Sequence, residues 1–187
     1  MADNPGLNCR LENHPPGAEN QPRPVVVDPT ARWKINNECQ FLKLAREGKG
    51  KAPWIVTSLT ASQLPRENLE VLEQHGGKYI TLPTSPSGRM DWRLIMQSLK
   101  SEGLDSILID GGGKVINDWL SPENKQMLDS VIVTVAPTWL GRGGVVVCPE
   151  RRMDEQGNAQ VAARAWDVRW VGCGEDIVMC GRFKEFV

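Results

Sequence analysis

Three consecutive glycines between an apolar run and a helix start are the strongest chemical signal in the sequence. The run Ile107–Ile109 ends at Asp110, and Gly111–Gly113 then lead into Lys114 and Val115. Glycines allow positive φ angles and a close approach to a ligand, and the first-turn N–H groups of a following helix point to the same place. Such a turn at the carboxyl end of a parallel strand is typical of phosphate sites. It is neither a Walker loop nor the dinucleotide fingerprint, so a phosphate site and a plain tight turn both stay open.

A second glycine-rich segment, Leu140–Gly144, follows the longest apolar run of the chain, Val131–Ala136. One interpretation is a flexible loop at the same end of the sheet, with Arg142 near an anionic group. The other is a surface loop with a solvated arginine. The sequence alone does not separate the two.

Other catalytic patterns are missing from the sequence. There is no Gly-x-Ser-x-Gly segment, and His14 and His75 have no Cys, Ser or acidic partner at the spacing of a triad or metal site. The seven tryptophans are scattered rather than arranged in stacking rows. If the protein is an enzyme, a bound cofactor must therefore supply the chemistry while protein groups position the reactants.

Alternating strands and helices would position these segments. We expect a surface loop at 12–23 and a helix that Asp91 caps and Gly103 stops, with Leu94, Ile95 and Leu99 facing the core. The other predicted helices cover 39–47, 65–75 and 115–120, and predicted strands cover 24–28, 54–57, 79–82, 106–110 and 131–136. Strands that are apolar on both faces indicate a mainly parallel sheet covered on both sides.

The last part of the chain has a different pattern. The segments Val145–Val147, Trp166–Trp170 and Ile177–Cys180 are apolar, and few helix signals separate them. This pattern favours antiparallel strands appended to the sheet.

Composition limits the class of protein. The 187 residues are 40% hydrophobic and 24% charged, which fits one globular domain. A net charge of −1 gives no basic surplus for nucleic acid or an anionic membrane. No apolar run approaches the about 18 residues of a membrane span. The five cysteines form no C-x-x-C pair, so we expect reduced cysteines in a cytoplasmic protein.

Several segments, taken in order, resemble one family. They are Ala2–Arg10, Arg23–Asp28, Ile109–Ile116, Val135–Pro137 with Leu140–Gly141, and Gly174–Arg182. Together they resemble the fungal-type riboflavin-pathway reductases that act on 2,5-diamino-6-ribosylamino-4(3H)-pyrimidinone 5′-phosphate. These are related to the reductase half of the bacterial riboflavin deaminase-reductase. The resemblance implies an α/β fold, a dihydrofolate-reductase-like three-layer sandwich with a mainly parallel central sheet and antiparallel C-terminal strands.

The resemblance also implies an activity and its residues. The family reduces the ribosyl side chain of its substrate to the ribityl form with NADPH, an early step of riboflavin biosynthesis. The implied cofactor contacts are Asp3, Pro29, Thr30, Met90, Gly111, Gly112, Gly113, Lys114 and Val115. Leu7, Arg10 and Asp110 would meet the substrate, with Arg10 holding its phosphate. Residues 1–187 would form a single domain, and a homodimer is expected.

Two features depart from the family pattern. The family usually has a glutamate before the glycines, where this chain has the shorter Asp110. In the family, a strand with a Ser-x-Asp-Gly segment, a helix and a second strand also precede the segment that begins here at Ala2. If the polypeptide begins at Met1, we expect exposed apolar surface, an unpaired sheet edge, impaired stability and little or no turnover.

The residues leave other functions open. One is a truncated, non-catalytic paralogue that binds a nucleotide or a full-length partner. Another is a reductase with a different substrate. No residue stands out as the proton donor.

Overall fold

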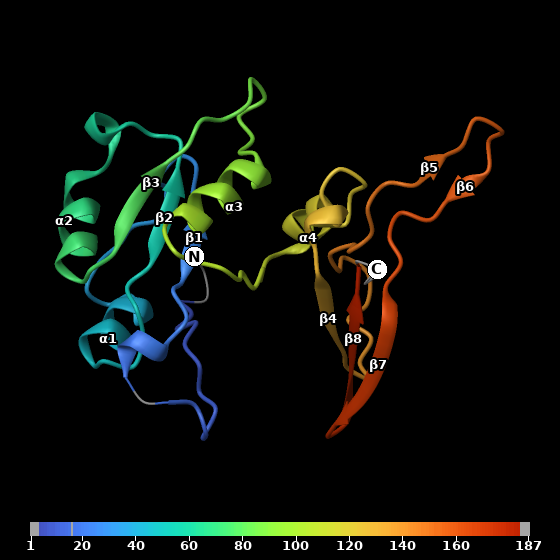
Figure 1. Cartoon of the computed structure of the whole chain (residues 1–187), viewed down its shortest axis with the longest axis horizontal. Helices are drawn as coiled ribbons and strands as arrows, with labels where there is room; N and C mark the ends of the chain where they lie inside the picture. The colour runs from blue at the N-terminus through green and yellow to red at the C-terminus, as the bar shows by residue number, and fades with distance from the viewer. Residues whose placement is uncertain (1–3, 16, 184–187) are drawn as a thin grey trace. The chain divides into compact units, whose positions relative to one another are not determined.

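The computed structural model describes residues 4–15 and 17–183, and the chain divides into two compact units, Met1–Asp105 and Ser106–Val187 (Figure 1). None of the helices in the described residues combines the length and the apolar composition of a membrane-spanning segment.

The first unit is built on a parallel sheet. Its strands are β1 (Val25–Val27), β2 (Trp54–Thr57) and β3 (Lys78–Thr81), in the order β1-β2-β3. Val26 pairs with Ile55, and Ile55 pairs with Tyr79. The three predicted strands are therefore confirmed, each within two residues of its expected bounds, because β-branched and aromatic residues favour the extended backbone.

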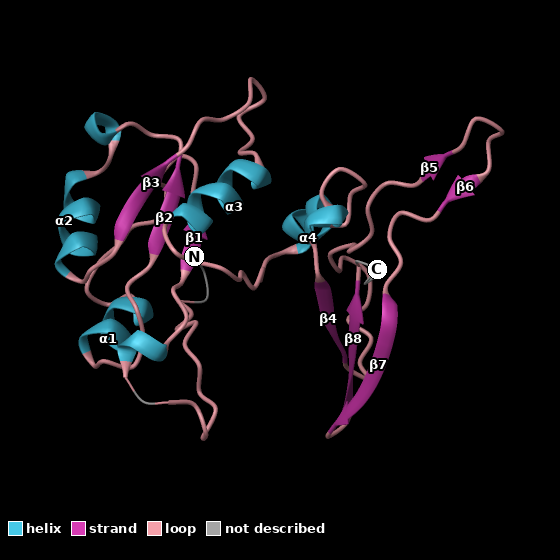
Figure 2. Cartoon of the chain, in the orientation of Figure 1, coloured by secondary structure: helices cyan, strands magenta, loops and turns pink. Residues whose placement is uncertain are grey.

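Helices cover both faces of this sheet (Figure 2). The helices are α1 (Gln40–Arg46), α2 (Arg66–Gln74) and α3 (Trp92–Ser101), with short 3-10 turns η1 (Ala18–Asn20) and η2 (Ala61–Gln63). One buried cluster joins Ile55 to Phe41 and Leu72 of α1 and α2. The other joins Val56 to Ile95 and Leu99 of α3. Successive β2 residues thus face opposite layers, as the period of two in a strand requires.

The N-cap of α3 and the apolar face of this helix can both be compared directly with the sequence prediction. Asp91 is the N-cap, and its Oδ1 accepts a hydrogen bond from the Arg93 backbone N–H at 2.8 Å, as predicted. Ile95 and Leu99 are buried, but Leu94 is exposed, so its predicted place in the core is wrong. Residues one apart in a helix differ in direction by about 100°, and the narrow face against the sheet holds only one of the two neighbours.

A buried asparagine of α2 fixes the loop that follows β1. Asn68 Nδ2 donates to the Trp33 carbonyl at 2.9 Å, and Asn68 Oδ1 accepts from the Ile35 N–H at 3.3 Å. Burial raises the pKa of the nearby Tyr79 phenol, and a hydrogen bond with Asn68 opposes that shift. The amide therefore satisfies backbone groups that secondary structure does not.

Replacing Asn68 should destabilise the first unit. We expect Asn68→Ala to lower the free energy of unfolding by about 1–3 kcal/mol, because it leaves the buried Ile35 N–H and the half-buried Trp33 carbonyl without their partner. Urea denaturation followed by tryptophan fluorescence measures the change. Glu73→Ala, at an exposed position of the same helix, is the control and should stay within about 0.5 kcal/mol of the unaltered protein. Equal stability of the two variants would contradict this prediction.

The second unit carries an antiparallel sheet of strands β4 (Ser130–Val135), β8 (Asp176–Arg182) and β7 (Trp166–Cys173), in the order β4-β8-β7. It also contains α4 (Gly113–Trp119), the 3-10 turn η3 (Lys125–Met127) and the hairpin of β5 (Arg152–Met153) and β6 (Ala159–Gln160). The predicted antiparallel C-terminal strands at 166–170 and 177–180 are confirmed. They are not appended to the parallel sheet as expected, but pair with β4 in a second sheet, in which the strand predicted at 131–136 runs antiparallel to β8.

Two predicted strands are wrong. Residues 106–110 and 145–147 form no strand, and the side chain of Leu108 is 86% exposed. An apolar run becomes a strand only where a neighbouring strand completes its hydrogen bonds, and neither segment has such a neighbour among the described residues.

Candidate functional site

Three loops leave the parallel sheet at the same edge. Pro29–Thr30 follows β1, Ser58–Thr60 follows β2, and Pro83–Met90 follows β3. Because all three strands run parallel, these loops share the carboxyl edge of the sheet. This is the edge at which open α/β sheets bind ligands.

The Pro29 carbonyl fixes the first of these loops to the second. It accepts hydrogen bonds from the Ser58 N–H at 2.9 Å, the Ser58 hydroxyl at 2.7 Å and the Thr57 hydroxyl at 3.1 Å. Buried Asp28 accepts from the Trp33 N–H at 2.8 Å and holds the far side of the loop. Thr30 is exposed at the tip of this turn, where its hydroxyl is available to a ligand.

Met90 closes the loop that follows β3. It pairs with Thr84 in an isolated antiparallel bridge, and the Ser85 N–H donates to the Arg89 carbonyl at 2.8 Å between them. The Met90 side chain packs against the cluster that contains Val56 and Ile95. Its side chain thus serves the core, and its backbone remains at the sheet edge.

The N-terminal segment carries the predicted substrate residues of the first unit. Leu7 and Arg10 are both exposed, and Leu7 has a φ of +47°, a left-handed conformation that is rare for a branched side chain. Their neighbours Asn8 and Cys9 line an open pocket together with Leu11, His14, Pro15, Gly17, Gln21, Gly48 and Lys49. Strain of this kind is found at ligand sites. The predicted cofactor residue Asp3 lies outside the described residues.

The glycine turn lies in the second unit and opens α4. Gly112 is the N-cap, with a φ of −69°, and neither Gly111 nor Gly113 has a positive φ, so the turn does not use the positive φ that glycine allows. Close packing explains two of the glycines instead. A Cβ on Gly113 would lie 2.1 Å from Val145 Cγ1, and a Cβ on Gly111 would lie 2.9 Å from the Val115 side chain.

Gly112 differs from Gly111 and Gly113 because a side chain at this position would have room. Apart from its own residue and its two chain neighbours, no protein atom lies within 4 Å of the position that its Cβ would take. The absent side chain therefore leaves an open space at the start of α4, next to the exposed side chains of Asp110 and Lys114. Backbone N–H groups at a helix start and the Lys114 ammonium both favour an anion there, whereas the Asp110 carboxylate disfavours one, so the phosphate position stays a prediction.

The second glycine-rich loop leads directly into the segment held against α4. Asn117 Nδ2 donates to the Val146 carbonyl at 2.8 Å, beside the contact between Gly113 and Val145. Gly141 and Gly143 have φ angles of +81° and +96°, so this loop does need glycine for its turns. Arg142 is exposed in it.

The structure does not bring all the predicted site residues together. Leu7 and Arg10 lie on the N-terminal segment, which is held to Gln21 and Lys49, residues that precede β1 and β2 rather than follow them. The remaining predicted residues form one group in each unit. In the first, Pro29, Thr30 and Met90 share the sheet edge, and in the second, 110–115 form one continuous turn. Sequence reasoning missed Ser58 and Thr60, although they follow directly on the predicted strand at 54–57 and the rule for carboxyl ends would have found them. In the described part of the chain, no cluster of three or more His, Cys, Asp or Glu side chains could hold a metal ion.

Comparison with known proteins identifies the relatives of this chain. The sequence model of the family described as the RibD C-terminal domain matches residues 1–179. A Debaryomyces hansenii protein is 35% identical over 185 residues, which are 97% of this chain and 68% of that protein. A Kluyveromyces marxianus protein is 36% identical, over 97% of this chain and 66% of that protein. Both are named 2,5-diamino-6-ribosylamino-4(3H)-pyrimidinone 5′-phosphate reductase. The chain spans about two thirds of the length of these relatives.

Solved structures give the same result for the fold. The riboflavin biosynthesis reductase Rib7 of Saccharomyces cerevisiae aligns with a TM-score of 0.72 and 26% identity, over 98% of this chain and 70% of that one. RibD of Acinetobacter baumannii aligns with a TM-score of 0.65 and 18% identity, over 97% of this chain and 43% of that one, and shows the fold alone. The resemblance and the α/β, dihydrofolate-reductase-like class inferred from the sequence are confirmed.

Proposed function

Because the chain belongs to the RibD C-terminal domain family, we propose that it is a reductase of riboflavin biosynthesis. In this proposal it uses NADPH to reduce the ribosyl side chain of 2,5-diamino-6-ribosylamino-4(3H)-pyrimidinone 5′-phosphate to the ribityl form. The observation that carries the proposal is the match of the family model to residues 1–179. It is supported by the 35% identity to the Debaryomyces hansenii protein, which is named as the pyrimidinone phosphate reductase.

A nicotinamide cofactor, when bound, supplies the hydride for such a reduction. The open space at Gly112 supports a phosphate position at the start of α4, with the Lys114 ammonium contributing positive charge. Pro29, Thr30 and Met90 offer a second contact surface for the cofactor at the sheet edge. Asp3 completes the proposed cofactor set.

The substrate is a phosphate ester, and Arg10 is suited to it. A guanidinium forms two parallel hydrogen bonds with a phosphate and is always charged at neutral pH. Arg10 is exposed, so it is free to turn toward a ligand. Leu7 would contact an apolar part of the substrate, and Asp110 would accept a hydrogen bond from its amino or hydroxyl groups.

A second candidate function rests on the length of the relatives, of which the chain covers 68% and 66% in the two comparisons. It is a non-catalytic protein that binds a nucleotide, or a full-length partner, without turnover. The residues proposed for the cofactor are the same in both functions. Turnover therefore separates them.

The test is a titration followed by an assay. NADPH is titrated into the purified full chain by calorimetry, and its absorbance at 340 nm is then followed after the pyrimidinone phosphate is added. Binding and oxidation together support the reductase. Binding without oxidation supports the non-catalytic protein. No binding of NADPH contradicts both the reductase and a non-catalytic protein that binds this nucleotide.

Three further properties stay predictions. A homodimer would sediment at twice the mass of the 20.8 kDa chain. We also predict a cytoplasmic location. The third prediction is that residues 1–187 fold as a single riboflavin-reductase-like domain.

A further inference from the structure

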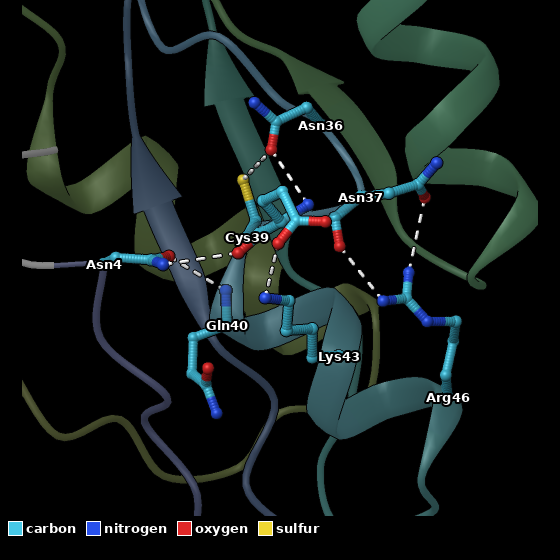
Figure 3. Close-up of polar contacts among 8 residues, drawn as sticks. Asn4, Asn36, Asn37, Cys39, Gln40, Lys43 and Arg46 are labelled. Carbon is cyan, nitrogen blue, oxygen red and sulfur yellow. Dashed lines mark hydrogen bonds and ion pairs between the residues drawn. The ribbon is translucent and has the colours of Figure 1, made fainter.

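Helix α1 begins without a capping side chain of its own. Its N-cap residue is Cys39, which makes no side-chain capping hydrogen bond. The first N–H groups of a helix have no partner within the helix, and uncapped starts lose stability. Figure 3 shows that a distant residue supplies the missing acceptor: Asn4 Oδ1 accepts from the Gln40 N–H at 2.8 Å, across 36 residues of sequence.

The Asn4 side chain forms hydrogen bonds through both its amide oxygen and its amide nitrogen. Its Nδ2 donates to the Glu38 carbonyl at 3.3 Å, one residue before the N-cap (Figure 3). Its backbone has a φ of +39°, a conformation that asparagine tolerates better than most residues. An acceptor, a donor and a left-handed backbone are therefore all needed at one position.

The turn at 36–39, to which Asn4 is hydrogen-bonded, is itself held by other hydrogen bonds. Asn36 Oδ1 accepts from the Glu38 N–H at 3.0 Å, and Arg46 donates to the Asn37 side chain at 3.3 Å and to its carbonyl at 3.0 Å (Figure 3). The turn from 36 to 39 is thus fixed from both sides before Asn4 attaches to it.

The segment after Asn4 runs along α1 and is attached again beyond the end of the helix. A Cβ on Gly6 would lie 2.8 Å from Leu44 Cδ1, so the chain passes close to the helix there. Asn8 Nδ2 donates to the Lys49 carbonyl at 3.1 Å, and the Cys9 N–H donates to Gln21 Oε1 at 2.8 Å. Leu7 lies between the attachments of Asn4 and Asn8, and Arg10 follows directly after the last one.

We propose that Asn4 is a positioning residue for the substrate: by fastening the N-terminal segment to the start of α1, it fixes the place from which Leu7 and Arg10 reach the ligand. This inference deepens the proposed function and rests on it for the identity of the ligand. The fastening itself does not depend on that function. Two measurements therefore test the two parts separately.

The first measurement is limited proteolysis of the full chain. Trypsin cleaves after the exposed Arg10, and cleavage requires the segment to detach. Asn4→Ala removes both hydrogen bonds, so we expect cleavage after Arg10 to be about tenfold faster. Cleavage after Arg142, which lies in an exposed loop of the other unit, should be unchanged.

Two further variants make the proteolysis result specific. Asn4→Asp keeps the acceptor for the Gln40 N–H and loses only the donor, so it should be cleaved at a rate between those of Asn4→Ala and the unaltered protein. Asn158→Ala changes an asparagine of the β5–β6 turn and should leave cleavage after Arg10 unchanged. Equal cleavage rates in Asn4→Ala and the unaltered protein would overturn the fastening.

The second measurement is substrate binding by calorimetry, with the pyrimidinone phosphate as the probe. Asn4→Ala should raise its Kd about five- to tenfold. The same substitution in a background that carries both Leu7→Ala and Arg10→Ala should add less than twofold, because Asn4 acts through the segment that carries these two residues. Equal effects in both backgrounds would overturn the positioning role. If the unaltered protein did not bind the pyrimidinone phosphate, the proposed function would be contradicted. The trypsin result would then decide by itself whether Asn4 fastens the N-terminal segment to α1.

Discussion

A Gly112→Asp variant should bind NADPH at least a hundredfold more weakly than the unaltered protein and be no less stable. Gly112 is the N-cap of α4, and a Cβ there meets no atom within 4 Å beyond its own residue and its two chain neighbours. Aspartate is a favoured N-cap residue, and its charge suits the helix dipole, so folding should not suffer. The same carboxylate would occupy the space proposed for a cofactor phosphate and repel it.

Two comparisons make this result interpretable. Gly112→Asn has the same size and capping ability without the charge, so it should weaken NADPH binding less, by about tenfold. Gly172→Asp adds the same charge on β7, where a Cβ also meets no protein atom within 4 Å, and should not change the Kd. Fluorescence titration of NADPH and thermal unfolding measure the two effects. If Gly112→Asp bound NADPH within threefold of the unaltered protein, the phosphate position at α4 would be wrong.

Phe41→Ala should lower the free energy of unfolding by about 3–5 kcal/mol, the largest stability change that we expect from one side chain. Phe41 is 1% exposed and belongs to the cluster between the sheet and the helices α1 and α2. It also meets the Trp33 ring edge-to-face, with the centroids 5.6 Å apart. Because the Trp33 N–H donates to Asp28, the cavity should loosen the loop that carries Pro29 and Thr30.

Urea denaturation and the Kd of NADPH measure the two consequences of Phe41→Ala. Leu11→Ala is the control, since Leu11 is 75% exposed and should change stability by less than about 0.5 kcal/mol. A loss below 1 kcal/mol for Phe41→Ala would show that this cluster does not hold the first unit together. If Phe41→Ala lowered stability and left the Kd of NADPH unchanged, the loop at Pro29 would not contribute to cofactor binding.

Some structural features escaped sequence reasoning although their signals were local. The turn between β5 and β6 is one: Asp154 accepts from the N–H groups of Gln156 at 3.0 Å and Asn158 at 2.7 Å, and Gly157 has a φ of +81°. An aspartate with Gly-Asn three and four residues further on, at 154, 157 and 158, is a turn signal that the sequence displays. The hairpin could therefore have been predicted.

The sequence by itself determined the elements whose causes are local: the parallel strands at 25–27, 54–57 and 78–81, the cap of α3 at Asp91, and the family to which the chain belongs. Pairing and packing between distant residues were decided only by the tertiary structure. Residues 106–110 have the composition of a strand and form none, because a strand depends on a neighbour that composition does not specify. In the same way, only the folded chain brings Asn4 to α1 and Val145 to Gly113, and these contacts give the two proposed sites their form.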